Sequence, residues 1–281
     1  MRTVLITGTS SGFGLATSVE LAKRGWNVVA TMRDLGKRGE LDRAVQSAGV
    51  GDRVRVEQLD VTDPQSIDAA VARLDLPNRP LDAVVHNAGV AVGGAFEDLD
   101  ETHIRRVMEV NYFGVLALTR RLLPTFRAQQ RGRIVIISSE SAFAGQPANS
   151  PYSASKWAIE GWAEALAYEV EHFNIQIILI EPGAYRTNIW ESSPRVLPKE
   201  SPYFPLLRHL EVAVEAHVAK AARDPIEVAK AVAGTLDSPR PRFRNPVGPT
   251  AKFMHFARGK LPSTVVRKIF GRFFSLNKVR W

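Results

Sequence analysis

Short, almost continuously apolar stretches alternate with longer amphipathic stretches along the first two-thirds of this chain. The apolar stretches have the length of β-strands, and the segments between them have the length and period of helices. Strands that are apolar on both faces are typical of a parallel sheet covered on both sides. The predicted fold class is therefore α/β, a single Rossmann-type doubly wound parallel sheet with helices on both faces. The predicted strands are residues 3–7, 28–32, 54–59, 83–86, 133–138 and 175–180.

The alternation of strands and helices breaks after Pro182. Residues 188–223 are rich in Pro, Ser and aromatic residues and are interpreted as a helical substrate lid, and residues 240–281 as a C-terminal extension. Trp190, Tyr203 and Phe204 either line a substrate pocket or form the core under this lid. No repeat or linker is visible, so we expect one domain over residues 1–281. The predicted helices cover residues 14–24, 39–48, a segment opened by Pro64, 101–129, 151–173 and 224–236.

The chain contains no cysteine, which excludes disulfides, thiolate metal sites and a cysteine nucleophile. It opens directly on a strand-like run without the pattern of a signal peptide. No apolar run approaches the roughly 20 residues that span a bilayer. These features lead us to expect a cytoplasmic protein.

The net charge of +8 is concentrated in residues 240–281, which contain eleven Lys/Arg and no Asp/Glu. A basic amphipathic helix can lie on an anionic membrane surface, which gives one interpretation of this tail. The favoured interpretation is that it packs on the body beside the ligand site with its charges solvated. No nucleic-acid-binding module accompanies the charge, so no nucleic acid partner is predicted. One helical face carries Val266, Ile269, Phe270, Phe273 and Phe274, with Arg267, Lys268 and Arg272 nearer the other.

Tyr152 and Lys156 lie four residues apart at the predicted start of the helix over residues 151–173. Ser150 is a good N-cap and Pro151 suits the first turn, so both functional side chains emerge from one helix face. A fixed ammonium beside a phenol is expected to lower the pKa of the phenol from about 10 toward neutrality. The pair is a candidate general acid/base, although Tyr-x-x-x-Lys alone occurs by chance in amphipathic helices.

Other unusual residues fall where predicted strands end. In an open parallel sheet, ligands bind outside these carboxyl ends. A glycine-rich turn after the first strand would let a pyrophosphate reach backbone N–H groups and the helix N-terminus. A buried amide in mid-helix, Asn111, could bind a water. The strand-end residues are Gly8, Gly12, Gly14, Asp60, Asn87, Ser139 and Pro182-Gly183.

Taken together, these motifs resemble the short-chain dehydrogenase/reductase family over residues 3–187. Their joint occurrence, in order and with the family's spacings, is far more specific than any single motif. The run of residues 30–34 and the basic extension are similar to the subgroup of 17β-hydroxysteroid and retinol dehydrogenases. The matching motifs are Thr7-Gly8-x-x-x-Gly12-x-Gly14, Asn87-Ala88-Gly89, Asn111, Ser139, Tyr152-x-x-x-Lys156 and Pro182-Gly183.

The resemblance implies an oxidoreductase that interconverts a secondary alcohol and a ketone on a bulky apolar substrate of steroid, retinoid or aryl ketone type. It gives Tyr152 the proton transfer, with Lys156 lowering its pKa and binding the nicotinamide ribose. It gives Ser139 the polarisation of the substrate oxygen, and Asn111 a water that links Lys156 to solvent. One departure is His86, where many members carry a second Asn, and we expect it to change strand packing more than catalysis.

The resemblance also implies the cofactor contacts. Asp60 and Val61 would flank the adenine, Asn87 the adjoining ribose and Thr187 the carboxamide. The full expected set is Gly8, Ser10, Ser11, Gly12, Phe13, Gly14, Arg33, Asp60, Val61, Asn87, Ala88, Gly89, Tyr152, Lys156, Pro182, Gly183 and Thr187.

The choice of cofactor is predicted from charge. NAD-specific folds place an acid after the second strand to bind the ribose 2′-OH. Here Met32 occupies that region and Arg33 follows it, which favours a 2′-phosphate, to which Ser11 could add a hydroxyl. Asp34 is the opposing observation, since it could instead pair with Arg33 on the surface. NADP(H) is predicted over NAD(H).

Two other function classes stay open. A non-catalytic dinucleotide sensor or scaffold with a membrane- or partner-binding basic tail would be expected to lose catalytic side chains, and this chain has lost none. A carbonyl isomerase or dehydratase on the same fold is a third interpretation. The six histidines show no metal-ligand spacing, so no metal site is predicted. Family members often pair through the helices that correspond here to residues 101–129 and 151–173, which implies a homodimer.

Overall fold

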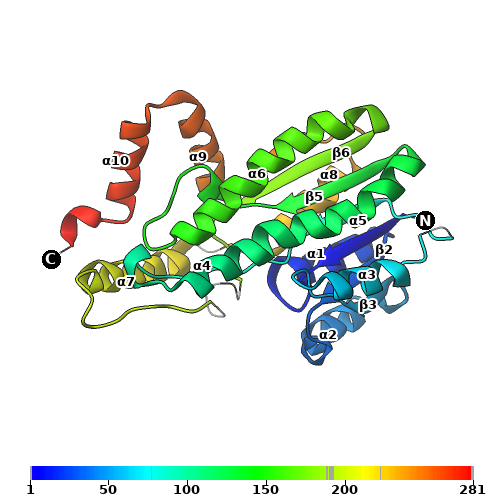
Figure 1. Ribbon diagram of the computed structural model, residues 1–281, viewed down its shortest axis with the longest axis horizontal. Coiled ribbons are helices and arrows are strands. Elements are labelled where there is room, and N and C mark those ends of the chain that lie inside the picture. The colour runs from blue at the N-terminus through cyan, green and yellow to red at the C-terminus, as the bar shows by residue number, and fades with distance from the viewer. Residues whose placement is uncertain (1, 77, 188, 190–192, 222, 280–281) are drawn as a thin grey trace.

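A parallel sheet forms the centre of the molecule, and helices cover both of its faces (Figure 1). The computed structural model describes residues 2–76, 78–187, 189, 193–221 and 223–279. In this part of the chain seven strands pair in the order β3-β2-β1-β4-β5-β6-β7. The predicted fold class is confirmed. The strands are β1 (Thr3–Thr7), β2 (Asn27–Met32), β3 (Val54–Gln58), β4 (Ala83–His86), β5 (Gly132–Ile137), β6 (Ile175–Pro182) and β7 (Arg244–Val247).

The chain reverses its direction of travel across the sheet at β1. Strand β1 pairs with β2 on one side and with β4 on the other, so the chain crosses from β3 back over β1 to reach β4. Leu5 lies opposite Val29 on one side and Val84 on the other. Such a switch point leaves a crevice outside the carboxyl ends of the two central strands. The loops after β1 and β4 therefore define where a ligand can bind.

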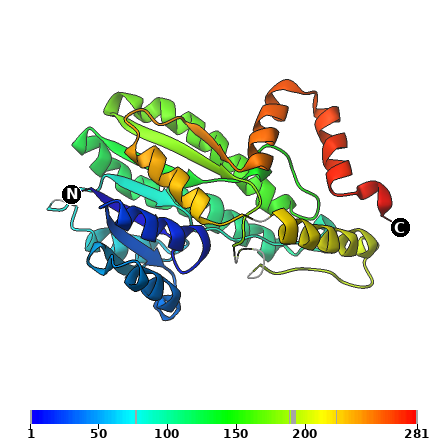
Figure 2. The same ribbon diagram turned by 180° about the vertical axis from the view of Figure 1, so that it is seen from behind.

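Each face of the sheet has its own apolar core. On one face Leu118 and Phe126 of α5 and Ile159 of α6 pack against β1, β4 and β5. On the other face α1, α2 and α8 pack, as Figure 2 shows from behind. The helices of the layered body are α1 (Gly12–Lys23), α2 (Gly39–Ser47), α3 (Pro64–Arg73), α4 (Glu101–Met108), α5 (Gly114–Gln129), α6 (Ser150–Val170) and α8 (Ile226–Asp237).

The predicted helix over residues 101–129 contains a π-helical turn, Glu109–Phe113, between α4 and α5. A π-turn inserts one extra residue into the helical ladder and often marks a functional site. Here it contains Asn111, whose side chain is buried. The turn therefore fixes the direction in which this amide leaves the helix.

The seventh strand, β7, lies inside the segment that the sequence assigns to the C-terminal extension, so the predicted boundary at residue 240 is wrong. Residues 244–247 complete the sheet beside β6, and Pro246 is tolerated because β7 is an edge strand. Arg244 ties the strand to the body by donating to Glu160 at 2.5 Å and to Glu181 at 2.8 Å. The helical extension begins only after this strand.

The lid and the extension lie at the end of the molecule remote from β3 (Figure 1). The lid forms helix α7 (Phe204–Ala221), and the extension forms α9 (Pro249–Lys260) and α10 (Ser263–Phe273). Helix α9 packs on the body through Ala251, Met254 and Ala257. Helix α10 has no buried residue, and only Phe274 directly after it is buried. Both views show α9 and α10 standing out from the layered body.

Candidate active site

The glycine turn between β1 and α1 is shaped for close approach of a ligand. Gly8 and Gly12 have φ angles of +69° and +57°, in the left-handed region that favours glycine. A Cβ on Gly14 would lie 2.2 Å from the carbonyl oxygen of Gly8, so no side chain fits there. Ser11, the N-cap of α1, makes no side-chain capping bond, and the first turn of α1 contains no acidic residue. This N-terminus suits an anionic group such as a pyrophosphate.

Asn87 braces this turn from the neighbouring strand. Its Nδ2 donates to the carbonyl oxygens of Thr7 and Gly8, both at 2.8 Å, and its backbone N–H donates to Thr7 Oγ1 at 2.9 Å. Both amide hydrogens are thus used within the protein. Asn87 lines the cavity, and its amide holds the glycine turn in shape.

Tyr152 and Lys156 converge on one spot from helix α6. Both side chains are buried, and Lys156 Nζ lies 5.5 Å from the centre of the Tyr152 ring. Nζ donates to the carbonyl oxygen of Ile137 at the end of β5, at 2.9 Å. The Tyr152 hydroxyl hydrogen-bonds to Ser139. The helix therefore delivers its phenol and ammonium to the carboxyl edge of the sheet, beside the Ser139 hydroxyl.

The structure contradicts the expectation that Lys156 lowers the pKa of Tyr152. Burial raises the pKa of Tyr152 to about 12, although the hydrogen bond with Ser139 acts in the opposite direction. Burial likewise lowers the pKa of Lys156 to about 8, against the charge of Glu160, which acts to raise it. The Lys156 ammonium is bonded to the Ile137 carbonyl oxygen. The phenol is consequently held in its protonated form, which is the form that can donate a proton.

Asn111 is engaged by protein groups on both sides of its amide. Its Nδ2 donates to the carbonyl oxygen of Val90 at 2.9 Å and to Ser155 Oγ at 3.0 Å. Its Oδ1 accepts from the backbone N–H of Val90 at 2.9 Å. Only the second lone pair of Oδ1 is left for the predicted water. A Cβ on Gly89 would lie 3.4 Å from this oxygen and 3.9 Å from Lys156 Nζ, so all three groups meet at the exit of β4.

The end of the cavity near β2 and β3 is rich in basic side chains. Arg33, Lys37 and Arg43 line it, and only Arg33 was singled out from the sequence. Asp34 accepts from the backbone N–H of Gly36 at 2.9 Å and caps a 3₁₀ turn, so its carboxylate has a structural task. Lys37 and Arg43 were missed because nothing in their spacing shows that they face a cavity.

Asp60 closes the same end of the cavity. It accepts hydrogen bonds from the backbone N–H and the hydroxyl of Thr62, at 2.9 Å and 2.7 Å. Burial acts to raise its pKa, but these bonds and the charges of Arg33 and Arg106 outweigh it and hold the pKa below its ordinary value. Asp60 is therefore ionised at neutral pH, and it lines the cavity beside Val61.

His86, at the end of β4, is a packing residue. It is buried, burial lowers its pKa to about 3, and its Nε2 lies 2.9 Å from Thr119 Oγ1 of α5. The neutral imidazole joins the sheet to α5, in agreement with the expectation that it affects strand packing. The described residues contain no group of His, Asp and Glu arranged to hold a metal ion.

One continuous cavity of about 980 Å³ runs from the glycine turn past Tyr152 to the lid and the extension. Tyr203 and Phe204 do not line it, and the Tyr203 hydroxyl donates to Glu97 at 2.9 Å, so pocket lining, one of the two interpretations left open by the sequence, is not supported for them. Trp190 lies outside the described residues. The cavity also takes in the remaining predicted contacts except Gly14, and Thr187 lies close to Gly12. Its apolar wall near the lid consists of Ile189, Leu197, Leu207, Leu210, Ala213, Phe273 and Phe274.

Glu140 directly follows Ser139 and was left without a role by the sequence. It lines the cavity, and burial raises the pKa of its carboxyl, although the Thr250 hydroxyl acts in the opposite direction. Its Oε2 is buried and has no hydrogen-bond partner. The carboxyl therefore lies at the junction between the catalytic edge and the start of α9.

Comparison with known proteins identifies the family. The family model described as short chain dehydrogenase matches residues 2–196. Retinol dehydrogenase 8 of Bos taurus is 36% identical over 260 residues, which are 86% of this chain and 80% of that protein. The human 17-beta-hydroxysteroid dehydrogenase type 1 is 34% identical over 254 residues, 86% of this chain and 76% of that protein. This chain is a short-chain dehydrogenase.

Solved structures agree with this assignment. A short-chain dehydrogenase from Streptomyces avermitilis superimposes with a TM-score of 0.80 at 32% identity, over 99% of this chain and 98% of that chain. More distant members with the same fold, at 23% and 22% identity, are an alcohol dehydrogenase from Thermococcus sibiricus complexed with 5-hydroxy-NADP and a Burkholderia phymatum protein in complex with NAD. The predicted family and its subgroup are confirmed, and the short-chain dehydrogenase is an oxidoreductase whose structural neighbours bind NAD or NADP.

Proposed function

We propose that this short-chain dehydrogenase interconverts ketones and secondary alcohols with NADP(H), and that Tyr152 is its general acid/base. The observation that carries the proposal is that Tyr152, Ser139 and Lys156 meet in one cavity that begins at the glycine turn. The backbone cradle of Gly8 and Gly12 fits a dinucleotide pyrophosphate, and Lys156 would reach the nicotinamide ribose. When bound, the cofactor supplies or accepts the hydride.

The protein's own residues handle the proton. In reduction, the Tyr152 O–H donates its proton to the substrate carbonyl oxygen as that oxygen gains negative charge. The Ser139 hydroxyl donates a second hydrogen bond to the same oxygen and orients it. The Lys156 ammonium stabilises the phenolate that this proton transfer leaves on Tyr152. Oxidation reverses both steps, with the Tyr152 phenolate taking the proton from the alcohol. The high pKa of Tyr152 matches the task of keeping this proton until the oxygen can take it.

A bulky apolar substrate is supported by the wall of the cavity beyond Tyr152. Leucine, isoleucine and phenylalanine side chains of the lid and extension form this wall, and they would pack against a large hydrocarbon skeleton. The printed names of two relatives refer to a retinol and a hydroxysteroid, both bulky and apolar. We therefore propose the same class of substrate for this chain.

The decisive experiment replaces Tyr152 by Phe. The variant is expected to fold and bind NADPH but to lose about 10²- to 10⁴-fold in kcat, because the proton donor is gone. The measurement is turnover on a panel of steroid, retinoid and aryl ketones and alcohols with both cofactors. Tyr203→Phe is the matched control, since its hydroxyl bonds to Glu97 on the surface. Near-normal turnover by Tyr152→Phe would remove Tyr152 as the acid.

The preference for NADP(H) rests on the basic end of the cavity. Arg33, Lys37 and Arg43 line it, and the Asp34 carboxylate is bonded to Gly36. Arg33→Asp is expected to lower the NADPH/NADH ratio of kcat/KM by at least about tenfold, because a carboxylate repels a 2′-phosphate and can accept from a 2′-OH. Arg131→Asp, at the opposite edge of the sheet, is the control. An unchanged ratio in Arg33→Asp would contradict the charge argument.

We further propose that the extension contacts an anionic membrane surface without spanning it. Among the described residues, no helix combines the length and apolar character that a transmembrane segment requires. Phe253 and Phe256 of α9 are 50% and 62% exposed, and Phe273 of α10 is 50% exposed, in a strongly basic segment. Exposed aromatics with Lys and Arg suit the boundary of anionic lipid. These exposures favour a membrane contact over a tail packed entirely on the body.

Vesicle co-sedimentation tests the membrane contact. Wild type is expected to bind vesicles of phosphatidylcholine with phosphatidylserine more strongly than phosphatidylcholine alone. The double variant Phe253→Ser/Phe256→Ser is expected to bind less strongly, while its secondary structure is unchanged. Equal binding by the wild type and the double variant would contradict the proposal.

A homodimer through α4, α5 and α6 is proposed as the working assembly. Tyr168 of α6 is 74% exposed and Phe113 of the π-turn is 48% exposed, so both elements present an aromatic side chain that a second copy could cover. Light scattering after gel filtration is expected to give a dimer for wild type and a monomer for Tyr168→Arg. A monomeric wild type would contradict this assembly.

A further inference from the structure

The irregular segment that carries Ser139 depends on groups outside itself. Residues 139–149, here called the Ser139 segment, join β5 to α6 and begin with the 3₁₀ turn Glu140–Ala142. Within the segment, Ser139 Oγ accepts from the backbone N–H of Ser141 at 3.1 Å. The carbonyl oxygens of Ser141 and Ala142 accept from two side chains of helices α6 and α9.

The first of these side chains is Trp157, which directly follows Lys156 in α6. Its Nε1 donates to the carbonyl oxygen of Ser141 at 2.8 Å. The indole is 44% exposed, so burial of apolar surface alone does not explain a tryptophan here. The hydrogen bond ties the Ser139 segment to the helix that carries Tyr152.

The second side chain is Arg258, which comes from α9 in the extension. Its Nη1 donates to the carbonyl oxygen of Ala142. The guanidinium carbon also lies 4.1 Å from the centre of the Trp157 ring, a distance at which a cation and an aromatic face attract each other. Arg258 thus contacts the Ser139 segment and α6 at the same time.

Two further contacts join α9 to the same segment. The rings of Phe143 and His255 lie 5.2 Å apart at 67°, an edge-to-face arrangement. A Cβ on Gly183 would lie 2.3 Å from Thr250 Oγ1 and 3.0 Å from Glu140 Oε2, so these two side chains approach the backbone after β6 together. Helix α9 therefore contacts the first part of the Ser139 segment, at Glu140, Ala142 and Phe143.

We infer that α9 acts as a clamp on the Ser139 segment, and that Arg258 and Trp157 are positioning residues for the reaction. They hold the Ser139 hydroxyl in register with the Tyr152 phenol, so that both reach one substrate oxygen. This inference rests on the proposed function, because it takes Ser139 as the group that polarises that oxygen. Misplacement of such a group by about 1 Å can cost about 10²-fold in rate.

Hydrogen exchange tests the clamp without any substrate. In Arg258→Gln and in Trp157→Phe, peptides that cover residues 139–149 are expected to exchange faster than in wild type, with the rest of the sheet unchanged. Lys260→Gln, on the exposed last turn of the same helix, is the matched control and is expected to match wild type. Unchanged exchange of residues 139–149 in both Arg258→Gln and Trp157→Phe would overturn the clamp.

A double-mutant cycle tests whether the clamp acts through Ser139. With the panel ketone that wild type reduces fastest, Arg258→Gln is expected to lower kcat about 10- to 100-fold and leave the KM for NADPH unchanged. Arg258→Lys, which keeps the cation, is expected to restore part of this loss. In a Ser139→Ala background, Arg258→Gln is expected to cause no further loss.

The hydrogen-exchange experiment and the double-mutant cycle test the clamp and the proposed reaction separately. Full additivity of the Ser139→Ala and Arg258→Gln losses would overturn the positioning role, because it would show that Arg258 acts independently of Ser139. If wild type reduces no ketone of the panel, the proposed function fails, and hydrogen exchange still decides whether α9 restrains the Ser139 segment.

Discussion

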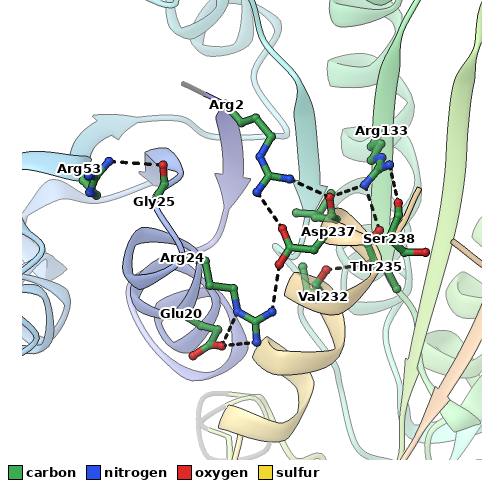
Figure 3. Close-up of polar contacts among 11 residues, drawn as sticks. Arg2, Glu20, Arg24, Gly25, Arg53, Arg133, Val232, Thr235, Asp237 and Ser238 are labelled. Atoms are coloured by element: carbon green, nitrogen blue, oxygen red, sulfur yellow. Dashed lines mark hydrogen bonds and ion pairs between the residues drawn. The ribbon is translucent and has the colours of Figure 1, made fainter. Parts of the chain in front are cut away.

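The amino edge of the sheet, where the strands begin, and the carboxyl edge, where they end, differ in what their arginine side chains contact. At the amino edge, Arg133 Nη2 donates to the carbonyl oxygen of Ser238 at 2.6 Å, and Arg2 and Arg24 both pair with Asp237, the last residue of α8 (Figure 3). At the carboxyl edge, Arg33 lines a large cavity together with Lys37 and Arg43. The arginines at the amino edge are paired with acceptors of the protein itself. The basic side chains at the carboxyl edge face the space where a ligand would bind.

This difference indicates how the fold separates stability from function. The arginines at the amino edge that are paired with protein groups hold α8 against α1 and against the starts of β1 and β5. Basic side chains gathered at a cavity raise the local positive potential and attract an anionic ligand. Substitutions at the amino edge should therefore change the free energy of unfolding, and those at the carboxyl edge should change binding, catalysis or pH response.

The largest effect on stability is expected for Arg133→Met. Arg133 donates to the carbonyl oxygens of Thr235, Leu236 and Ser238 at the end of α8 (Figure 3). Loss of these charged hydrogen bonds is expected to lower the free energy of unfolding by about 2–3 kcal/mol, although the Leu236 carbonyl oxygen keeps a bond from Arg2. Urea denaturation measures this, and kcat/KM should stay within about twofold of wild type.

The control for Arg133→Met is Arg131→Met. Arg131 is 62% exposed and pairs with Asp82 at 3.5 Å, so its loss is expected to cost less than about 1 kcal/mol. A large drop in kcat/KM for Arg133→Met at unchanged cofactor affinity would contradict the hypothesis that residues at the amino edge affect stability and not catalysis.

The next largest effect is a pH dependence of the free energy of unfolding, caused by His86 at the carboxyl edge. Its pKa is about 3 in the folded protein and 6.5 ordinarily, so below pH 6.5 the unfolded chain takes up a proton that the folded chain refuses. Stability therefore falls as the pH drops, by about 1.4 kcal/mol per unit at most and by about 2 kcal/mol between pH 7 and pH 5. His86→Asn should lack this loss.

The comparison of His86→Asn with wild type is needed because another buried group opposes the trend. Burial, with the nearby Glu160 charge, raises the pKa of Glu181 to about 8, although Arg244 pairs with it. The raised pKa makes the contribution of Glu181 to stability grow as the pH falls from about 8 toward 4.5. It is common to both proteins and cancels in their difference. Equal pH slopes of the unfolding free energy for wild type and His86→Asn would contradict the assignment.

The smallest effect is expected for Asp237→Asn. Its ion pairs with Arg2 and Arg24 join side chains that are 35% to 48% exposed. Surface pairs of this kind contribute roughly 0–1 kcal/mol and are screened by salt. Thermal unfolding at low and high salt should show a loss only at low salt. A loss above about 2 kcal/mol, or any change in kcat/KM, would show that the edges are coupled.

Much of the fold could be predicted because β1, β2, β4, β5 and β6 are almost entirely buried. Their apolar runs are readable without tertiary information, and β1 and β4 match their predicted bounds. Strand β7 was not predicted, because an edge strand is held on one side only and Arg244 and Pro246 interrupt any apolar run. Its position depends on Glu160 and Glu181, which lie far away in the sequence.

The placement of Tyr152, Lys156, Ser139 and the glycine turn in one cavity also followed from the sequence, because strand ends of a parallel sheet meet at one edge. The direction of the pKa shift of Tyr152 did not follow. The direction of that shift depends on how deeply the Tyr152 ring is buried and on which oxygen accepts the hydrogen bond from Lys156 Nζ. The contact between Arg258 and the Ser139 segment likewise needs the path of α9, which no local pattern encodes.

The position of β7 has a consequence for synthesis on the ribosome. Strand β6 ends at Pro182, yet its outer neighbour arrives only with Arg244–Val247, after the lid and α8 have been made. Until then a nascent chain presents one side of β6 as a row of unpaired backbone groups, which favours pairing with other chains. A product that stops before residue 244 keeps this exposed ladder permanently, so we expect such fragments to require chaperones or proteolysis even though they contain Tyr152 and Lys156.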